Sequence, residues 1–446
     1  MLSTANSQQP PVLHAETETV DPTKLDSYAR ILVEHAVALR SGQDLYIRSP
    51  QILHDMALRI GKAGYEREAR AVHYYLPDPD QLEQLICCGT LEQIALHHEE
   101  EREFYSRILR AEGALIVLSD CFIPMPWMER AARSNRRNYA AFIAGMSETA
   151  SWLMNSIRGR LFPHTVAPCA TSRWAMALFP GVQEPNATRQ LWDLIFRFSF
   201  ADRPSPLHAI ADQNRCHKAR TRSLNELEIR ELHLIGGGTD LRIGLSKKAR
   251  WVAGDIRTTA GQSFHPNFPS EEIFTTPDCR LTQGRLVASK PFRLLDCCLI
   301  KDLVLNFKDG YLINFEASEG REEFTSWIET DAGSRLLGEI ALVDQNSPIA
   351  QAGFYFDFPH IDENAASHIA LGQAVALAIE RGEMMSGKEL NQLGFNQSVI
   401  HTDIMFGSPA VTVLATQSRE GEVVLIEGGQ WAERFSVAKL AAPQGL

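Results

Sequence analysis

The sequence predicts an α/β protein of two domains, the first with a mainly parallel sheet and the second a mixed α/β domain. Three observations support this prediction. The chain has 446 residues, whereas a single hydrophobic core stops growing near roughly 250 to 300 residues. Helical and strand-like patterns alternate in the first third of the chain, which favours a parallel sheet covered on both faces. From residue 232 onward short strand patterns dominate, so the chain changes character.

Composition and charge exclude several classes of protein. The 44% hydrophobic and 22% charged residues are ordinary for a soluble globular protein. The sequence holds no apolar run of about 18 residues that could span a bilayer. The net charge of −11 argues against a nucleic-acid binder. The eight cysteines include no Cys-x-x-Cys pair, and residues 1–20 predict a disordered tail rather than a secretory signal. A cytoplasmic protein with reduced thiols is therefore expected.

The first domain, residues 21–225, is expected to alternate between helices and strands. Asp21 and Pro22 open a helix whose apolar residues recur at helical spacing until Gly42. β-branched and aromatic runs predict the strands, and amphipathic or charged runs predict the helices. Further helices are expected at 53–62, 91–110 and 125–135, and strands at 45–48, 69–76, 114–119 and 139–145. The segment 147–222 then turns predominantly helical.

The second domain, residues 226–446, is expected to consist mainly of short strands. The boundary is placed in the helical connection between residues 190 and 230. Gly236-Gly237-Gly238 lacks a following Lys-Ser/Thr pair, so it predicts a tight turn between two strands rather than a phosphate loop, with Asp240 capping the turn. The expected strands are 233–235, 241–245, 250–254, 285–289 and 295–307.

His401-Thr402-Asp403 lies between apolar residues and predicts a strand. Residues i and i+2 of a strand point to the same face, so the imidazole of His401 and the carboxylate of Asp403 would lie side by side. Such a pair suits a metal ion. A hydrogen-bonded His-Asp pair at the end of a strand is the alternative.

Two more candidate metal ligands lie in apolar surroundings. Glu339 sits within an apolar run, where an unpaired carboxylate is costly to bury, so a metal ion or an arginine is expected to face it. His368 opens an amphipathic segment that predicts a helix over 368–380. On the alternative interpretation, Ser367 or Asn364 only caps that helix, and Asp362 and Glu363 are the acids that favour a helix start.

Glu271 and Glu272 precede a short strand that ends at Pro277. In an extended segment their carboxylates face opposite sides, so at most one of them is expected to bind a metal ion. The other would be solvated or paired, or it would serve as a general base toward a bound water.

Four ordered motifs carry a resemblance to a known family. They are Glu-Glu-Ile-Phe-Thr-Thr-Pro-Asp at 271–278, Leu-Gly-Glu-Ile-Ala-Leu-Val at 337–343, Asp-Glu-Asn-Ala-Ala-Ser-His-Ile-Ala-Leu-Gly at 362–372 and His-Thr-Asp-Ile-Met-Phe-Gly-Ser at 401–408. Together they resemble the M29 family of metallo-aminopeptidases, the thermophilic-aminopeptidase or AmpS/PepS type, with this chain as a divergent member.

The resemblance implies a function and a set of ligands. The family's chemistry is the removal of the N-terminal residue from a peptide or small amide by a metal-activated water. It implies two divalent ions, Zn, Co or Mn, with Glu339 as the bridge, and a homodimer. The composition, rather than the resemblance, predicts a cytoplasmic protein without nucleic-acid or membrane partners. Carried over to this sequence, the metal ligands would be Glu272, Glu339, His368, His401 and Asp403.

The chain departs from the family pattern near those ligands. The family places a catalytic tyrosine seven residues after the motif histidine, and here that residue is Val375. His360 is an additional imidazole just before the Asp-Glu-Asn motif, so Glu271 and His360 are the candidate catalytic residues. Two alternatives remain open: a non-peptidase enzyme on the same scaffold, such as an Fe(II)-dependent ring-cleaving dioxygenase, and a metal-binding protein without turnover.

Overall fold

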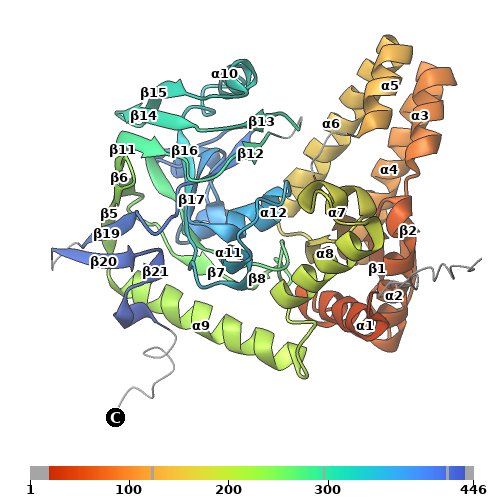
Figure 1. Ribbon diagram of the computed structural model, residues 1–446, viewed down its shortest axis with the longest axis horizontal. Coiled ribbons are helices and arrows are strands. Elements are labelled where there is room, and N and C mark those ends of the chain that lie inside the picture. Colours follow the sequence, from red (N-terminus) through yellow and green to blue (C-terminus); the bar gives the residue numbers. More distant parts are fainter. Residues whose placement is uncertain (1–19, 122–124, 295–296, 418–420, 437–446) are drawn as a thin grey trace, which may run out of the picture.

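The computed structural model of the chain describes residues 20–121, 125–294, 297–417 and 421–436. The tail predicted for residues 1–20 falls almost wholly on residues 1–19, outside the described part. The predicted α/β class is confirmed. The helix-rich N-terminal half and the strand-rich C-terminal half lie side by side, and the long helix α9 (Pro206–Glu226) runs along one edge (Figure 1).

The N-terminal half is built on a four-stranded sheet in which every pairing is parallel. Its order is β2 (Val72–Tyr75), β1 (Leu45–Arg48), β3 (Ala114–Ser119) and β4 (His164–Pro168). Asp21 caps the first helix, as expected, by accepting a hydrogen bond from the Thr23 N–H. The surrounding helices are α1 (Pro22–Ile31), a π-helix (Leu32–Ala36), α2 (His54–Glu66), α3 (Pro79–Cys88), α4 (Leu91–Ala111), α5 (Pro126–Ser134), α6 (Arg136–Arg158), α7 (Ser172–Leu178) and α8 (Glu184–Phe198).

Two expectations for this half are wrong. The strand predicted over 139–145 lies inside α6, a continuous helix of 23 residues that is capped by the Asn135 side chain. The aromatic and apolar run at 139–145 has a composition that suits either a strand or a helix. It is helical because it lies within a long helix that packs on α4. The strand β4 lies in the segment predicted to be helical, where Pro163 precedes it and Pro168 is its last residue.

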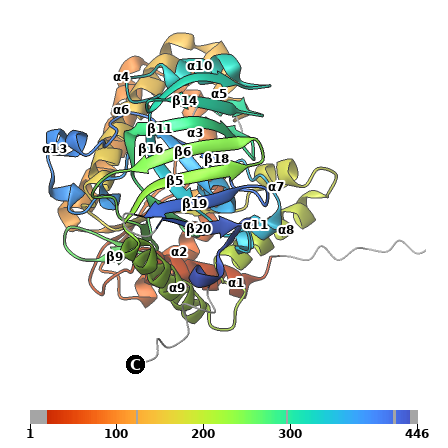
Figure 2. The same cartoon turned by 90° about the vertical axis from the view of Figure 1, so that its left-hand side faces the viewer.

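The C-terminal half contains two antiparallel sheets, and Figure 2 faces the larger one. In the eight-stranded sheet the order is β15 (Tyr311–Glu316), β14 (Val304–Lys308), β11 (Pro277–Val287), β6 (Thr239–Leu245), β5 (Ile229–Gly236), β19 (Thr412–Gln417), β20 (Glu422–Glu427) and β21 (Gln430–Trp431). The five-stranded sheet has the order β18 (His401–Met405), β17 (His368–Gly372), β16 (Leu337–Leu342), β10 (Ile273–Thr275) and β7 (Val252–Ala253).

Short elements complete this half. The two-stranded pairs are β8 (Ile256–Arg257) with β9 (Ser263–Phe264) and β12 (Phe292–Arg293) with β13 (Leu299–Ile300); the helices are α10 (Arg321–Ile328), α11 (Pro348–Ala352), α12 (Pro359–Asp362) and α13 (Gly387–Gln392). The triple-glycine turn between two strands is confirmed, because it joins β5 to β6. Asp240 does not cap it; its carboxylate lies 2.7 Å from Nε2 of His233.

The helix predicted over 368–380 is also wrong. His368 begins the strand β17, and the chain continues into a 3₁₀ turn at Ala376–Ala378. β17 is hydrogen-bonded on both sides, to β16 and to β18, and all five of its residues are buried. A short, fully buried strand in the middle of a sheet has no alternating pattern, so its sequence cannot be told from that of a buried helix.

The two halves share a hydrophobic core. Phe356 and Phe358, which precede α12, pack in the same cluster as the first helices and the parallel sheet. Trp174 of α7 donates a hydrogen bond from Nε1 to the Phe356 carbonyl at 2.6 Å, and Val166 of β4 bridges to Asn267. The expected boundary at residues 225 and 226 falls at the end of α9, and it stays a prediction.

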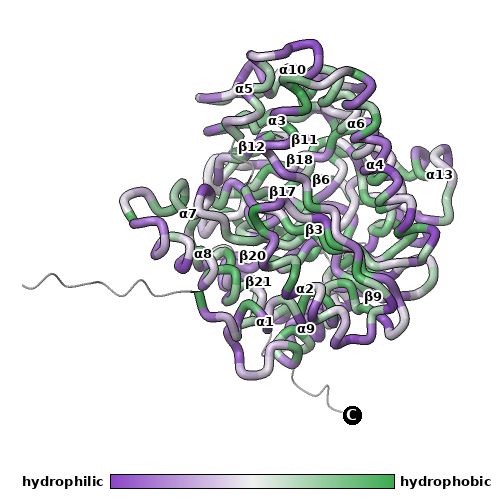
Figure 3. Tube along the Cα trace, turned by 90° about the vertical axis from the view of Figure 1, so that its right-hand side faces the viewer, coloured by the Kyte–Doolittle hydropathy of each residue, from purple (hydrophilic) through white to green (hydrophobic). Residues whose placement is uncertain are grey.

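The outer helices are amphipathic, with hydrophilic and hydrophobic residues alternating along them (Figure 3). In α4 the buried residues include Ile94, Phe104 and Ile108, whereas most of the charged residues face solvent. Within the described ranges, no helix combines the length and the apolar content that crossing a membrane requires.

A pair of buried histidines joins the halves. The rings of His35, from the π-helix, and His265, which follows β9, lie 4.4 Å apart between centroids, and the His265 N–H donates to the Ala36 carbonyl at 2.7 Å. Burial lowers the pKa of His35 to about 4 and that of His265 to about 3, although the nearby Asp255 carboxylate opposes the shift and Lys218 reinforces it. His217 lowers the pKa of His265 further.

This pair should make the protein less stable in acid. Both pKa values lie below the ordinary 6.5, so the unfolded chain binds more protons than the folded chain below pH 6.5. The free energy of unfolding should therefore fall as the pH drops from 6.5 toward 4, by on the order of 3 kcal/mol for His35 alone. Urea unfolding of His35→Gln at pH 7 and pH 4.5 should show a smaller loss than the wild type. An equal loss in both proteins would contradict this assignment.

Candidate metal centre

The five predicted metal ligands converge on one face of the five-stranded sheet. In the strand register, Ala370 of β17 lies opposite both Glu339 of β16 and Asp403 of β18, and Gly372 lies opposite His401. Residues opposite each other, and those two positions along a strand, share a face. The side chains of Glu339, Asp403, His368 and His401 therefore project together, and the small side chain of Ala370 leaves space between them.

The distances within the group are short. Nε2 of His368 lies 3.3 Å from Oε2 of Glu272 and 3.9 Å from Oδ1 of Asp403. Nε2 of His401 lies 3.3 Å from Oδ1 of Asp403 and 3.6 Å from Oε2 of Glu339. One ligand atom each of Glu272, Glu339 and His368 lies within 4.8 Å of the others. Glu272, Glu339, His368, His401 and Asp403 are called the sheet cluster below.

Both imidazoles are oriented by backbone carbonyls. Nδ1 of His401 lies 2.8 Å from the Gln373 carbonyl, and Nδ1 of His368 lies 3.3 Å from the Ala366 carbonyl. A carbonyl oxygen only accepts hydrogen bonds, so each Nδ1 is the natural place for a proton. In a neutral ring the lone pair then resides on Nε2, which faces the carboxylates. This is the tautomer that a metal-binding histidine requires.

The protonation equilibria show that the sheet cluster has too much negative charge for its degree of burial. Burial and the neighbouring Glu272 carboxylate raise the pKa of Glu339 to about 8. Burial disfavours charged imidazoles, yet the surrounding carboxylates outweigh it and raise the pKa values of His368 and His401 to about 10. The same imidazoles hold the pKa of Asp403 well below its usual range, although burial opposes them.

This donor set fits divalent metal ions. With both imidazoles neutral, as metal ligands must be, the three carboxylates carry a charge of about −3. Without an ion, protons on His368, His401 and Glu339 offset that charge, and a divalent cation would take the place of those protons. Oxygen and imidazole nitrogen are the ligands that Zn, Mn and Co take in proteins. Among the described residues, the partner of the Glu339 carboxylate is Nε2 of His401 rather than the arginine that was the alternative.

Glu271 and Glu272 diverge, as the strand geometry predicts. The Glu271 carboxylate faces away from the sheet cluster, with Oε2 3.9 Å from Nε2 of His217 on α9. Burial raises the pKa of Glu271 to about 7. Its backbone N–H donates to Oδ1 of Asn364 at 2.6 Å, which ties the strand end to the Asp-Glu-Asn motif. Only Glu272 of the two acids lies in the sheet cluster.

His360 lies beside the sheet cluster rather than in it. It belongs to the short helix α12, and its Nδ1 is 3.7 Å from Oε1 of Glu363. Burial lowers its pKa, but the carboxylates of Glu363, Asp403 and Glu272 together raise it above its ordinary value. Val375 follows β17 in the turn before residue 376, and its carbonyl accepts a hydrogen bond from the Thr276 hydroxyl at 3.0 Å.

Two buried acids of the Asp-Glu-Asn motif have roles that the sequence did not reveal. Asp362 does not start a helix. Its two oxygens accept hydrogen bonds from the N–H groups of Phe356 and Phe358, at 2.7 and 2.9 Å. Glu363 accepts from Nδ2 of Asn267 at 3.2 Å and faces His360. Both carboxylates are turned inward. The apolar residues around the motif are the sequence feature that could have indicated this.

A cavity opens directly beside the sheet cluster. Arg293 on its wall is paired with Asp357 and donates to the Cys297 carbonyl. The remaining wall is largely apolar on one side and carries candidate metal ligands on the other. Its lining residues are Phe292, Arg293, Leu294, Tyr355, Pro359, Asp362, His401, Thr402, Asp403 and Met405.

Comparison with known proteins decides the family. Residues 21–431 match the family described as thermophilic metalloprotease (M29). The chain belongs to the M29 family. It is 30% identical to aminopeptidase T of Thermus thermophilus over 91% of this chain and 98% of that one, and 29% identical to aminopeptidase AmpS of Bacillus subtilis over 92% and 98%. The solved structure of wild-type AmpT from Thermus thermophilus matches with a TM-score of 0.77 and 28% identity, covering 92% of this chain and 99% of that one.

Membership of the M29 family confirms the resemblance drawn from the four motifs, and with it a metal-dependent enzyme of the aminopeptidase type. The dioxygenase alternative finds no support in these relatives. The M29 match runs through both halves of the chain, so both halves belong to the fold that this chain shares with AmpT.

The opposite orientations of Glu271 and Glu272 give a matched pair of variants. Glu272→Gln should weaken the binding of Zn²⁺ or Mn²⁺ at least about tenfold, because it removes a charged donor from the sheet cluster. Glu271→Gln should leave metal affinity unchanged, because its carboxylate faces His217. Metal content per chain after dialysis against a weak chelator measures both. Loss of metal from the Glu271 variant alone would reverse the assignment.

Proposed function

We propose that this protein is a metallo-aminopeptidase that hydrolyses the first amide bond of a peptide or small amide and releases the N-terminal residue. The observation that carries the proposal is the convergence of five charged or imidazole side chains on one sheet face, at the edge of a cavity. A buried group of acids with oriented histidines is poorly explained as a structural element, because its uncompensated charge costs stability.

The sheet cluster would hold two divalent ions, and Glu339 would contribute a ligand to both. The Glu339 carboxylate approaches His401 through Oε2 and also groups with Glu272 and His368, so it is the member in reach of both ends. Two bound metal ions would polarise the substrate carbonyl and provide an activated water. Glu272 and His368 would hold one ion, and His401 and Asp403 the other.

His360 is proposed as the group that moves a proton during the reaction. Its Nδ1 is buried, faces Glu363, and makes no hydrogen bond among the described residues. A protonated imidazole there can donate to the departing amine, with Glu363 stabilising the charge. Glu271 is proposed as a positioning residue, because its backbone holds Asn364 while its side chain points elsewhere.

The cavity is proposed to receive the side chain of the N-terminal residue. Phe292, Leu294 and Met405 contribute apolar surface next to His401 and Asp403. An apolar wall favours substrates such as leucine or phenylalanine over charged ones. A homodimer is proposed from the family resemblance. A location in the cytoplasm is proposed from the composition, and the division into two domains at residues 225 and 226 is proposed from the change in sequence pattern.

Hydrolysis of leucine p-nitroanilide tests the proposal directly. Protein loaded with Zn²⁺, Co²⁺ or Mn²⁺ should release p-nitroaniline, and a chelator should abolish the activity. N-acetyl-leucine p-nitroanilide should not be cleaved, because an aminopeptidase requires the free α-amine. Release from the acetylated substrate at an equal rate, or no release by any metal-loaded form, would refute the assignment.

The residue at position 375 offers a second test. If the phenol absent at this position served to stabilise a developing oxyanion, Val375→Tyr should raise kcat by at least about tenfold, because one such donor is worth roughly 10² to 10³ in rate. Val375→Phe is the matched control, since it adds the ring without the hydroxyl. Equal rates for the two variants would show that the pocket of this chain works without a donor at that position.

A further inference from the structure

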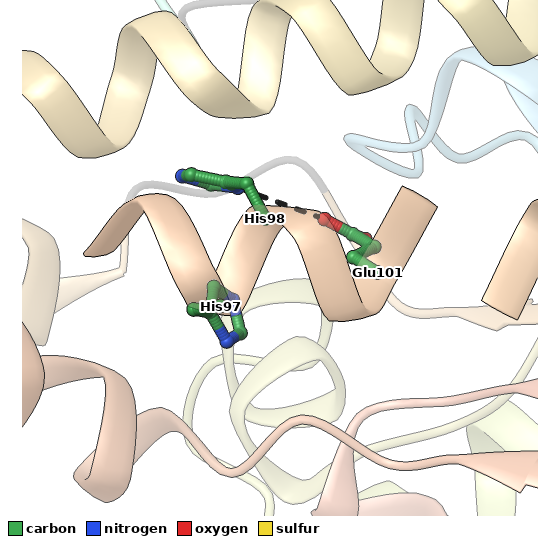
Figure 4. A group of neighbouring side chains, drawn as sticks. All are labelled: His97, His98 and Glu101. Carbon is green, nitrogen blue, oxygen red and sulfur yellow. Dashed lines mark ion pairs between the residues drawn. The ribbon is translucent and has the colours of Figure 1, made fainter. Parts of the chain in front are cut away.

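A second group of metal-binding side chains lies far along the chain from the sheet cluster, on helix α4. His97, His98 and Glu101 occupy its second and third turns, and one ligand atom of each lies within 4.8 Å of the others. Figure 4 shows His98 and Glu101 directed to the same side and joined by an ion pair, with His97 leaving the helix on the neighbouring side. These three residues are called the helix cluster below.

His98 is the unexplained member. Its side chain is 3% exposed, yet neither ring nitrogen has a hydrogen-bond partner among the described residues. The Oε2 atom of Glu101 lies 4.0 Å from Nδ1, which is too long for a hydrogen bond. Buried imidazole nitrogens without partners are destabilising and rare in folded proteins, so each one calls for a bound water or ion.

Glu101 is arranged to serve two partners. Its Oε1 atom is 3.5 Å from Nη2 of the half-buried Arg48, and its Oε2 atom faces His98. A carboxylate that binds a metal ion through one oxygen commonly has the other held by a neighbouring donor. Arg48 is that donor here.

Helix α6 is shaped around His98. A Cβ atom added to Gly145 would lie 2.2 Å from Cδ2 of the His98 ring, so only glycine admits the ring at this point. Phe142, one turn earlier, packs against both imidazoles, with ring centroids 5.9 Å from His97 and 5.1 Å from His98. Thr149, one turn later on the same face, has a buried hydroxyl without a hydrogen-bond partner among the described residues.

We propose that the helix cluster binds one divalent transition-metal ion, separate from any ion held by the sheet cluster. Two imidazoles and one carboxylate are a donor set that Zn²⁺, Co²⁺ and Ni²⁺ take in proteins. Spacings of three and four residues place Glu101 within reach of His98 and His97 on one helix. The half-exposed His97 ring turns about its side-chain torsions to complete the set, and the ion enters from that side. A water on the ion would reach the Thr149 hydroxyl.

Metal counting on the full chain tests this proposal. The wild type, His97→Gln and His98→Gln are stripped with chelator, dialysed against micromolar Zn²⁺ or Co²⁺, and assayed for metal per chain. Each variant should bind one ion fewer than the wild type, and leucine p-nitroanilide hydrolysis should be unchanged in His97→Gln. The control is Glu100→Gln, an exposed acid on the same helix that should lose nothing.

The same count in the Glu339→Gln background separates this site from the sheet cluster. Adding His97→Gln to that background should still remove one equivalent, whatever the sheet cluster binds. Folding of each variant is checked by circular dichroism, and the partly exposed position of His97 makes its variant the decisive one if His98→Gln does not fold. An unchanged metal count in folded His97→Gln, in both backgrounds, would overturn the proposal.

Discussion

The arrangement of the C-terminal half depends on gathering three carboxylates and two imidazoles on one face of a sheet, where Glu339 and His368 are buried and His401 is open to solvent. Isolated, each of these groups would be costly in a protein interior. Together they partly neutralise one another, because each imidazole lies between two carboxylates. The pKa values of His368 and His401 therefore rise, while that of Asp403 falls. Burial, and then the neighbouring Glu272 carboxylate, keep the pKa of Glu339 raised, so negative charge on this face is only partly balanced. A bound divalent cation would balance the negative charge that the imidazoles leave unbalanced.

The surrounding packing holds this face in position from the other half of the chain. The Asp362 carboxylate accepts hydrogen bonds from the N–H groups of Phe356 and Phe358. The side chains of these two residues are buried with Trp174 and the first helices. The Asp-Glu-Asn motif thus links the sheet cluster to the core beneath the parallel sheet. Asn364 extends the link to the strand end that carries Glu271 and Glu272. Positioning of the cluster is therefore shared by both halves.

Sequence reasoning found the ligands more easily than the elements that carry them. Residue types such as His401 and Asp403 identify themselves by chemistry and by alternation in a strand, and that pair forms as expected. The strand at His368 was mistaken for a helix because its partners β16 and β18 come from elsewhere in the chain, and local composition cannot report them. The same limit hid β4 and the inward turn of Asp362. Tertiary pairing overrides local preference at all three places.

The central place of β17 has a consequence for how the protein matures. Among the described residues β18, which carries His401 and Asp403, is an edge strand that pairs with β17 alone. In the chain it is followed by β19, which lies between β5 and β20 in the other sheet. On the ribosome, a chain that has reached residue 372 already contains Glu272, Glu339 and His368 but lacks the outer strand. The sheet face becomes a complete cluster only when nearly the whole polypeptide has been made. A chain that ends before residue 401 lacks two of the five side chains of the sheet cluster.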